Sequence, residues 1–123
     1  MSEKSLYDRL GGYDAISAVT LSMLDRMEKD PQLGRFWAHR SIDGVKRERQ
    51  FIVDFMVAST GGPLYYAGRD MVLSHRGMRI NQEDWEIFLG HADAALKEFH
   101  VPDAEYDEVV AFVQSTKGDI VEA

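Results

Sequence analysis

The chain has 123 residues, 45% of them hydrophobic and 28% charged, which suits the core of one folded domain and excludes a disordered protein. Its 21 acidic residues outnumber the 14 Lys and Arg residues, so the net charge of −7 disfavours a nucleic-acid partner. Cysteine is absent, which excludes disulfides, thiolate zinc sites and cysteine nucleophiles. No apolar run is long enough to span a membrane, and the first residues lack the apolar core of a secretory signal. We therefore expect a single domain, residues 1–123, in the cytoplasm, with neither nucleic acid nor a membrane as partner.

Apolar residues recur at intervals of three and four along most of the chain, and this spacing predicts an all-α fold. The first long helix is expected to follow Gly12, with Asp14 as its N-cap and an apolar side that ends at Met27. Asp30 and Pro31 resemble a cap followed by a proline at the first helical position, so they predict a short helical turn. The apolar residues of that turn are Leu33, Phe36 and Trp37.

The next helix is expected from about Val45 to the pair Gly61 and Gly62, where glycine permits a left-handed exit and Pro63 prevents continuation. One side of this helix is apolar, and its basic residues are expected to face mostly outward. The apolar residues are Phe51, Ile52, Phe55 and Met56, and the basic ones are Lys46, Arg47 and Arg49.

Residues 64–80 show no sustained period and predict a loop with at most one or two turns of helix. A long aperiodic connection inside a small domain is usually either functional or a sign that the elements are wrongly assigned. This one places Met71, His75 and Met78 close together in the sequence, among apolar neighbours. The other histidines are interpreted as structural or surface residues: His39, His91 and His100.

Two helices are expected after this loop. Asn81 is a suitable N-cap for the first, with Glu83 and Asp84 in its first turn, where they suit the helix dipole. Pro102 is expected to start the second, which runs to about Ile120. The sequence contains no phosphate-binding glycine loop, no paired-histidine zinc motif and no serine nucleophile elbow. Aromatic and Met side chains at helical spacing are more often core than the wall of a cofactor site, so both interpretations remain open at this point.

Several segments, taken together at their spacings, resemble the truncated haemoglobins. The first two are residues 5–12, Ser-Leu-Tyr-Asp-Arg-Leu-Gly-Gly, and residues 30–37, Asp-Pro-Gln-Leu-Gly-Arg-Phe-Trp. The third is Gly61-Gly62-Pro63 followed by Tyr66, Gly68, Arg69, Met71, His75 and Ile80. The length and the placement of the Gly-Gly pairs look most like group I of this family. Phe88 stands where the other groups have a characteristic tryptophan.

The resemblance implies an all-α, two-over-two helical sandwich around a haem (protoporphyrin IX iron), with His75 as the proximal iron ligand. Haem iron held by one neutral imidazole keeps its sixth position open for a diatomic gas. The other ring nitrogen of His75 should donate to a backbone carbonyl, which fixes the orientation of the ring. Tyr66, Arg69 and Arg79 are candidates for the propionate edge. The side chains expected to contact the haem are Phe36, Trp37, Phe51, Ile52, Phe55, Met56, Tyr66, Arg69, Met71, Met78, Ile80 and Phe88.

The side of the haem opposite His75 departs from the family pattern. Leu24 takes the position where many group I members have a tyrosine that donates to bound oxygen, and Ile52 stands where glutamine is common. Glu48 is expected to face the same pocket. Because Leu24 cannot donate a hydrogen bond, the resemblance implies an apolar distal pocket and faster oxygen release than in members with the tyrosine. His39 stays open as an alternative second axial ligand.

Three functions follow from these observations. The first is reversible binding of oxygen or another diatomic gas by a non-catalytic haem protein, which we expect to be a monomer or a weak dimer. The second is conversion of nitric oxide to nitrate with the help of an external reductase, which Leu24 disfavours because this reaction needs stable oxygen binding. The third is a haem-free helical module in which residues 64–80 recognise a protein partner.

Overall fold

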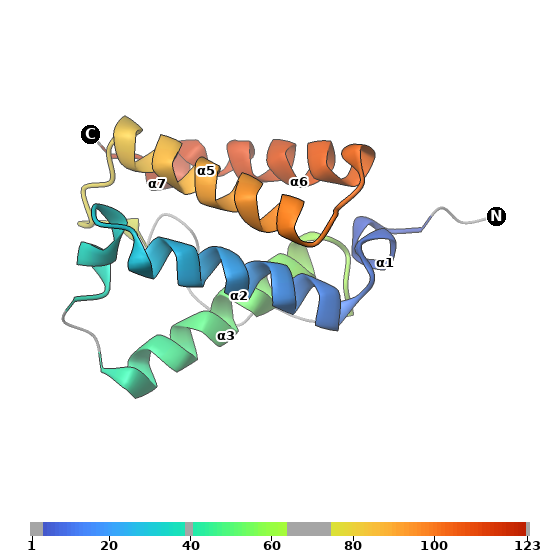
Figure 1. Ribbon diagram of the computed structural model, residues 1–123, viewed down its shortest axis with the longest axis horizontal. Helices are drawn as coiled ribbons and strands as arrows, with labels where there is room; N and C mark the ends of the chain where they lie inside the picture. Colours follow the sequence, from blue (N-terminus) through green and yellow to red (C-terminus); the bar gives the residue numbers. More distant parts are fainter. Residues whose placement is uncertain (1–3, 39–40, 64–74, 123) are drawn as a thin grey trace.

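The computed structural model describes residues 4–38, 41–63 and 75–122, and these ranges form helices without any strand (Figure 1). α2 lies between α3 on one side and α5 on the other, and α5 lies beside α6 in a second layer (Figure 1). The all-α prediction is confirmed. In chain order the elements are α1 (Leu6–Leu10), α2 (Tyr13–Lys29), the 3₁₀ helix η1 (Leu33–Phe36), α3 (Ile42–Ser59), α5 (Gln82–Glu98), α6 (Asp103–Ser115) and α7 (Lys117–Ile120).

The chain begins with a short helix that the periodicity did not predict. The Ser5 hydroxyl caps α1 by accepting a hydrogen bond from the backbone N–H of Asp8, and Gly11 ends it with a φ of +108°. Gly12, with a φ of +86°, then precedes α2 directly. The prediction that Asp14 caps α2 is therefore wrong, because the glycine pair turns the chain and starts the helix two residues earlier.

α1 is anchored to the end of α3. The backbone N–H of Tyr7 donates to the carbonyl of Thr60 at 2.8 Å, and its ring lies against Gly62. A Cβ atom at Gly62 would come within 2.7 Å of that ring and 2.6 Å of Val57 Cγ1, so only glycine allows this approach. The predicted helix exit is confirmed at Gly61, whose φ is +95°.

Local capping fixes most of the other helix ends. Asp30 Oδ1 accepts hydrogen bonds from the backbone N–H groups of Gln32 and Leu33, which confirms the predicted cap of the short turn. Ser41 caps α3 through Gly44, so α3 begins at Ile42, three residues before the predicted start.

α5 begins at the predicted position. Asn81 and Asp84 bind each other's backbone N–H group, which forms a capping box. The last helix follows Pro102 as expected but is divided at Thr116, whose hydroxyl donates to the carbonyl of Val113 at 2.7 Å.

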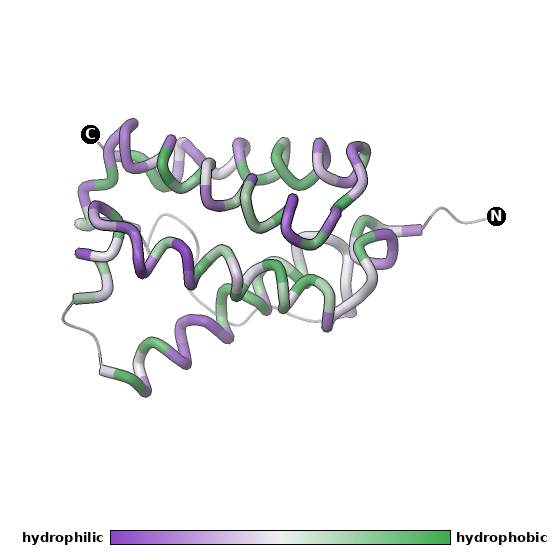
Figure 2. Tube along the Cα trace, viewed as in Figure 1, coloured by the Kyte–Doolittle hydropathy of each residue, from purple (hydrophilic) through white to green (hydrophobic). Residues whose placement is uncertain are grey.

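Two clusters of buried hydrophobic residues stand out in the described part of the chain. One lies between α5 and α6 and contains Trp85, Leu96, Val109 and Val113. The other lies where the hydrophobic parts of α2 and α3 cross (Figure 2), and it contains Ile16, Val53 and Val57. None of the helices described is long and apolar enough to cross a bilayer.

Candidate functional site

His75 lies at the start of the described segment 75–80, which connects to α5. Its side chain is half-buried, and its backbone carbonyl accepts a hydrogen bond from the N–H of Met78 at 3.2 Å. Met78 and Ile80 are half-buried, whereas Arg79 is exposed. Three other predicted haem contacts, Tyr66, Arg69 and Met71, lie outside the described residues.

The remaining histidines differ from His75 in their surroundings. His91 Nε2 lies 2.8 Å from Asp30 Oδ2, and this hydrogen bond, together with those from two backbone N–H groups, holds the pKa of Asp30 below its usual range. His100 is exposed at the end of α5. Both agree with the structural or surface role expected for them. His39 lies outside the described residues.

The residues expected on the distal side come from α2 and α3. Leu24 is 2% exposed in the middle of α2, and Glu48 and Ile52 are half-buried, one turn apart on α3. Phe51, beside Ile52, is 45% exposed. The side chains most deeply buried on α3 are Val53 and Val57, which pack against α2. The predicted list of apolar residues for this helix therefore omits Val53 and Val57, which attach α3 to α2.

Arg49 does not face outward as predicted. Its guanidinium donates to the carboxylates of Asp25 and Glu28 on α2, with 3.1 Å between Nε and Glu28 Oε2. The Arg49 side chain is only 23% exposed. These ion pairs connect α2 to α3 next to Leu24 and Glu48, so they fix the two elements that carry the predicted distal residues.

Aromatic side chains are brought together from several elements. Phe55 of α3 reaches Phe112 of α6, with ring centroids 5.8 Å apart. Phe88 contacts Trp85 at 5.2 Å within α5, and the two aromatic residues of the short turn, Phe36 and Trp37, meet edge to face at 6.4 Å. The Phe55 contact links α3 to α6, which belong to different layers.

A buried carboxylate holds the start of α5 against η1. Asp84 is 1% exposed and accepts hydrogen bonds from Gln32 Nε2 at 2.6 Å and from Arg35 Nη2 at 2.8 Å. Burial raises the pKa of Asp84, but the hydrogen bonds from Arg35, Gln32 and the N–H of Asn81 outweigh it, and the pKa lies below its usual range. Asp84 lies in the first turn of its helix as predicted, but nothing in the sequence pattern indicates that Gln32 and Arg35 are its partners.

An apolar cavity of about 150 Å³ lies between α2 and the end of α5. Met56 is the predicted site residue on its wall, which also contains Leu10, Ala15, Ile16, Val19, Thr20, Thr60, Leu96, Phe99, Val101 and Val109.

The donor groups of the described residues fit a haem better than a bare metal ion. These residues contain no group of three or more His, Asp or Glu side chains placed to bind a metal. A single imidazole is enough for haem iron, because the porphyrin supplies the other four ligands. The indole N–H of Trp85 is buried and lacks a hydrogen-bond partner, so the α5 layer also holds an unsatisfied donor.

The sequence and the fold of the chain are both similar to those of known globins. The family described as bacterial-like globin matches residues 5–122. The group 1 truncated hemoglobin GlbN of Mycolicibacterium paratuberculosis is 30% identical over 109 residues, which are 89% of this chain and 78% of that protein. The crystal structure of truncated hemoglobin from Tetrahymena pyriformis in its Fe(III) form has a TM-score of 0.87 at 25% identity and covers 98% of this chain and 100% of its own. The structure of Chlamydomonas reinhardtii THB1 has a TM-score of 0.80 at 30% identity, over 99% and 100% of the two chains. The chain therefore belongs to the bacterial-like globins and has the two-over-two fold of the truncated haemoglobins, resembling their group I, with haem as the cofactor of the family.

Proposed function

We propose that the protein binds haem through His75 and takes up oxygen or another diatomic gas reversibly. Bound haem supplies an iron with an open axial position. The observation that carries the proposal is the position of His75 in a chain of this family. Its side chain is half-buried in the segment that the resemblance assigns to the iron ligand.

The walls of the proposed haem site come from both layers. Ile52 and Phe55 would contact the haem from α3, and Phe88 would contact it from α5. Half-burial of all three and the Phe55 contact with Phe112 support this arrangement. The remaining wall residues of the proposal are Phe36, Trp37, Phe51, Met56, Tyr66, Arg69, Met71, Met78 and Ile80.

The distal pocket is proposed to be mainly apolar. Leu24 and Ile52 exclude water from their part of the pocket and have no group that can donate a hydrogen bond. A neutral hydrogen bond contributes about 0.5–1.5 kcal/mol, which corresponds to a change in ligand affinity of roughly two- to tenfold. We therefore expect Leu24→Tyr to slow oxygen dissociation by up to about tenfold, measured by stopped-flow spectroscopy. Leu24→Phe is the matched control, because it adds the ring without the hydroxyl, and an equal rate in both variants would contradict an apolar distal pocket.

Absorption spectra of the purified protein test the role of His75. The ferrous, gas-free protein should give the five-coordinate, high-spin spectrum of an imidazole-ligated haem, and His75→Ala should abolish it. His100→Ala is the control, because this exposed side chain should not affect the spectrum. The proposal fails if the wild-type protein has no Soret band after reconstitution with haem. A six-coordinate, low-spin ferrous spectrum that His39→Ala converts to high-spin would instead identify His39 as a second axial ligand.

Reaction with nitric oxide separates the binding function from the enzymatic alternative. The oxygenated protein should react slowly, because the distal residues do not retain oxygen strongly. Rapid nitrate formation on mixing with nitric oxide, sustained by an added reductase, would favour the enzyme. We also propose that the chain is one domain located in the cytoplasm, and that it is a monomer or a weak dimer. The net charge of −7 supports a low oligomeric state, because copies of the chain repel one another.

A further inference from the structure

The carboxylate of Glu122 binds the chain segment that follows His75. Its Oε2 accepts a hydrogen bond from the backbone N–H of Gly77 at 3.1 Å, and its Oε1 accepts one from the N–H of Arg79 at 2.9 Å. The backbone N–H of Glu122 returns a hydrogen bond to the carbonyl of Ile80 at 2.9 Å. One residue thus fixes three backbone groups within the four residues from 77 to 80.

This segment has a backbone that needs such support. Gly77 has a φ of +85° and Arg79 a φ of +58°. This left-handed backbone conformation is rare for residues other than glycine, such as Arg79. The N–H of Met78, between them, donates to the carbonyl of His75. The backbone of His75 is therefore connected through one hydrogen bond to a turn whose neighbouring N–H groups are both held by Glu122.

Glu122 itself is presented by a fixed part of the fold. It follows α7, where the N–H of Val121 donates to Lys117, and the side chains of Ile120 and Val121 pack against the core between α5 and α6. The hydrogen bonds from Gly77 and Arg79 hold the pKa of Glu122 below its usual range, so the group is ionised at neutral pH. An ionised acceptor makes stronger hydrogen bonds with backbone N–H groups than a neutral one.

We propose that Glu122 is a positioning residue for the haem: by binding the N–H groups of residues 77 and 79 it orients the His75 imidazole toward the iron. This role rests on the proposed function of His75 as the iron ligand. Removal of a residue that hydrogen-bonds directly to a metal ligand typically changes metal affinity by about 10- to 100-fold. Glu122 acts on His75 through the intervening turn, so we expect an effect at the lower end of that range. Glu122→Gln and Glu122→Ala should therefore release haem faster than the wild-type protein.

The test compares Glu122→Gln and Glu122→Ala with Glu86→Gln, which removes one negative charge from an exposed position on α5. The first readout is the iron–histidine stretching band of the ferrous, gas-free protein in resonance Raman spectra. The band should shift or broaden in both Glu122 variants and stay unchanged in the control. The second readout is haemin transfer to an excess of an apoglobin acceptor, which we expect to be about tenfold faster in Glu122→Ala and less accelerated in Glu122→Gln.

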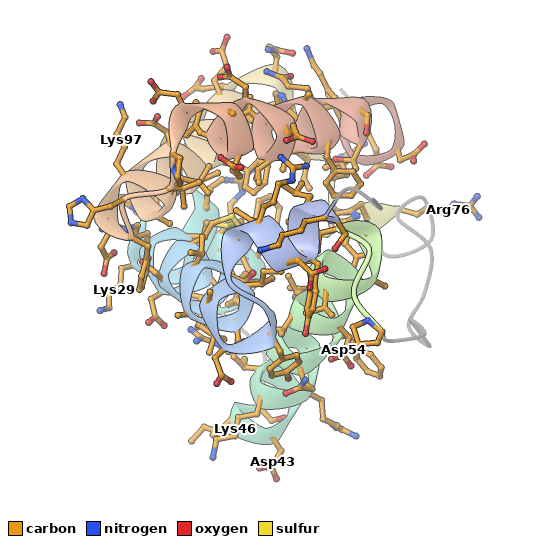
Figure 3. All side chains as sticks on the ribbon, turned by 90° about the vertical axis from the view of Figure 1, so that its right-hand side faces the viewer. Lys29, Asp43, Lys46, Asp54, Arg76 and Lys97 are labelled. Atoms are coloured by element: carbon orange, nitrogen blue, oxygen red, sulfur yellow. The ribbon has the colours of Figure 1, made fainter. Side chains whose placement is uncertain are left out.

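A third readout does not depend on haem. Arg76 and Arg79 are exposed, and Arg76 points away from the helices (Figure 3), so trypsin can report on how firmly this segment is held. In the full-length, haem-free chain, cleavage after these two arginines should be faster in Glu122→Ala than in Glu86→Gln, with equal helical circular dichroism.

The outcomes separate this inference from the proposed function. Wild-type stretching bands and wild-type haemin transfer in both Glu122 variants would overturn the positioning role and leave the role of His75 intact. A wild-type protein without an imidazole-ligated spectrum would refute the role of His75, and the positioning role with it, while faster cleavage in Glu122→Ala would still show that Glu122 holds the segment.

Discussion

The junction between η1 and α5 and the segment after His75 are both held by a carboxylate, but the two carboxylates differ in burial and in partners. At the junction, the buried Asp84 accepts hydrogen bonds from the Gln32 and Arg35 side chains as well as from the N–H of Asn81. In the segment, the exposed Glu122 accepts hydrogen bonds from the backbone N–H groups of Gly77 and Arg79. Water can take the place of an exposed carboxylate but not of a buried one, and Asp84 is 1% exposed, although the Arg35 side chain that it binds is 46% exposed. We infer that the junction mainly stabilises the fold, and that the segment mainly sets local geometry.

The largest expected effect is at the junction. Asp84→Asn replaces a charged acceptor with a neutral amide and turns one of its oxygens into a donor that faces Arg35 or Gln32. The free energy of unfolding should fall by roughly 1.5–3 kcal/mol, the range for hydrogen bonds to charged groups. Urea denaturation of the variant, with Glu86→Gln as control on the same helix, measures this. A loss no larger than that of the control would show that the junction is not the stronger of the two regions.

The pH dependence of the free energy of unfolding measures how much the junction carboxylates contribute to stability. The pKa values of Asp30 and Asp84 are both lowered in the folded protein. A carboxyl group with a lowered pKa stabilises the fold fully above its unfolded pKa and loses that contribution as the pH falls through the folded value. The urea midpoint should therefore change little between pH 7 and pH 5 and decrease below about pH 4. Asp84→Asn should show a shallower decrease, and an equally steep one would assign the acid sensitivity to other groups.

The smallest effect on global stability is expected for Glu122→Gln. Water can replace the lost acceptor at an exposed site, so the urea midpoint should match that of Glu86→Gln, although haem release is faster. Measuring both quantities on the same preparations tests the contrast directly. A midpoint as low as that of Asp84→Asn would mean that the segment after His75 is part of the stable core.

The sequence predicted best those features that depend on neighbours in the chain. The cap at Asn81, the turn after Asp30 and the exit at Gly61 are set within three or four residues, and all three are confirmed. The inward position of Arg49 depends on tertiary contacts with α2, and it was missed.

The same reason limits the prediction of the site. His75 was selected as the iron ligand because the segment around it resembles the proximal-histidine segment of the truncated haemoglobins, and that selection stays a prediction for the spectra to test. Glu122 carried no such signal, because it lies 45 residues from Gly77 in the chain and forms no motif with it. A partner this distant becomes visible only when the end of α7 is placed beside the segment.

The hydrogen bonds from Gly77 and Arg79 to Glu122 have a practical consequence for the preparation of the protein. In Figure 1, α1 and the end of α7 lie at opposite ends of the molecule. An affinity tag fused after Ala123 would begin one residue beyond Glu122, whose carboxylate holds Gly77 and Arg79. A tag placed before Ser5 would lie far from that turn. Recombinant material for haem measurements should therefore carry its purification tag at the amino end, and a comparison of both placements would report how much strain the turn tolerates.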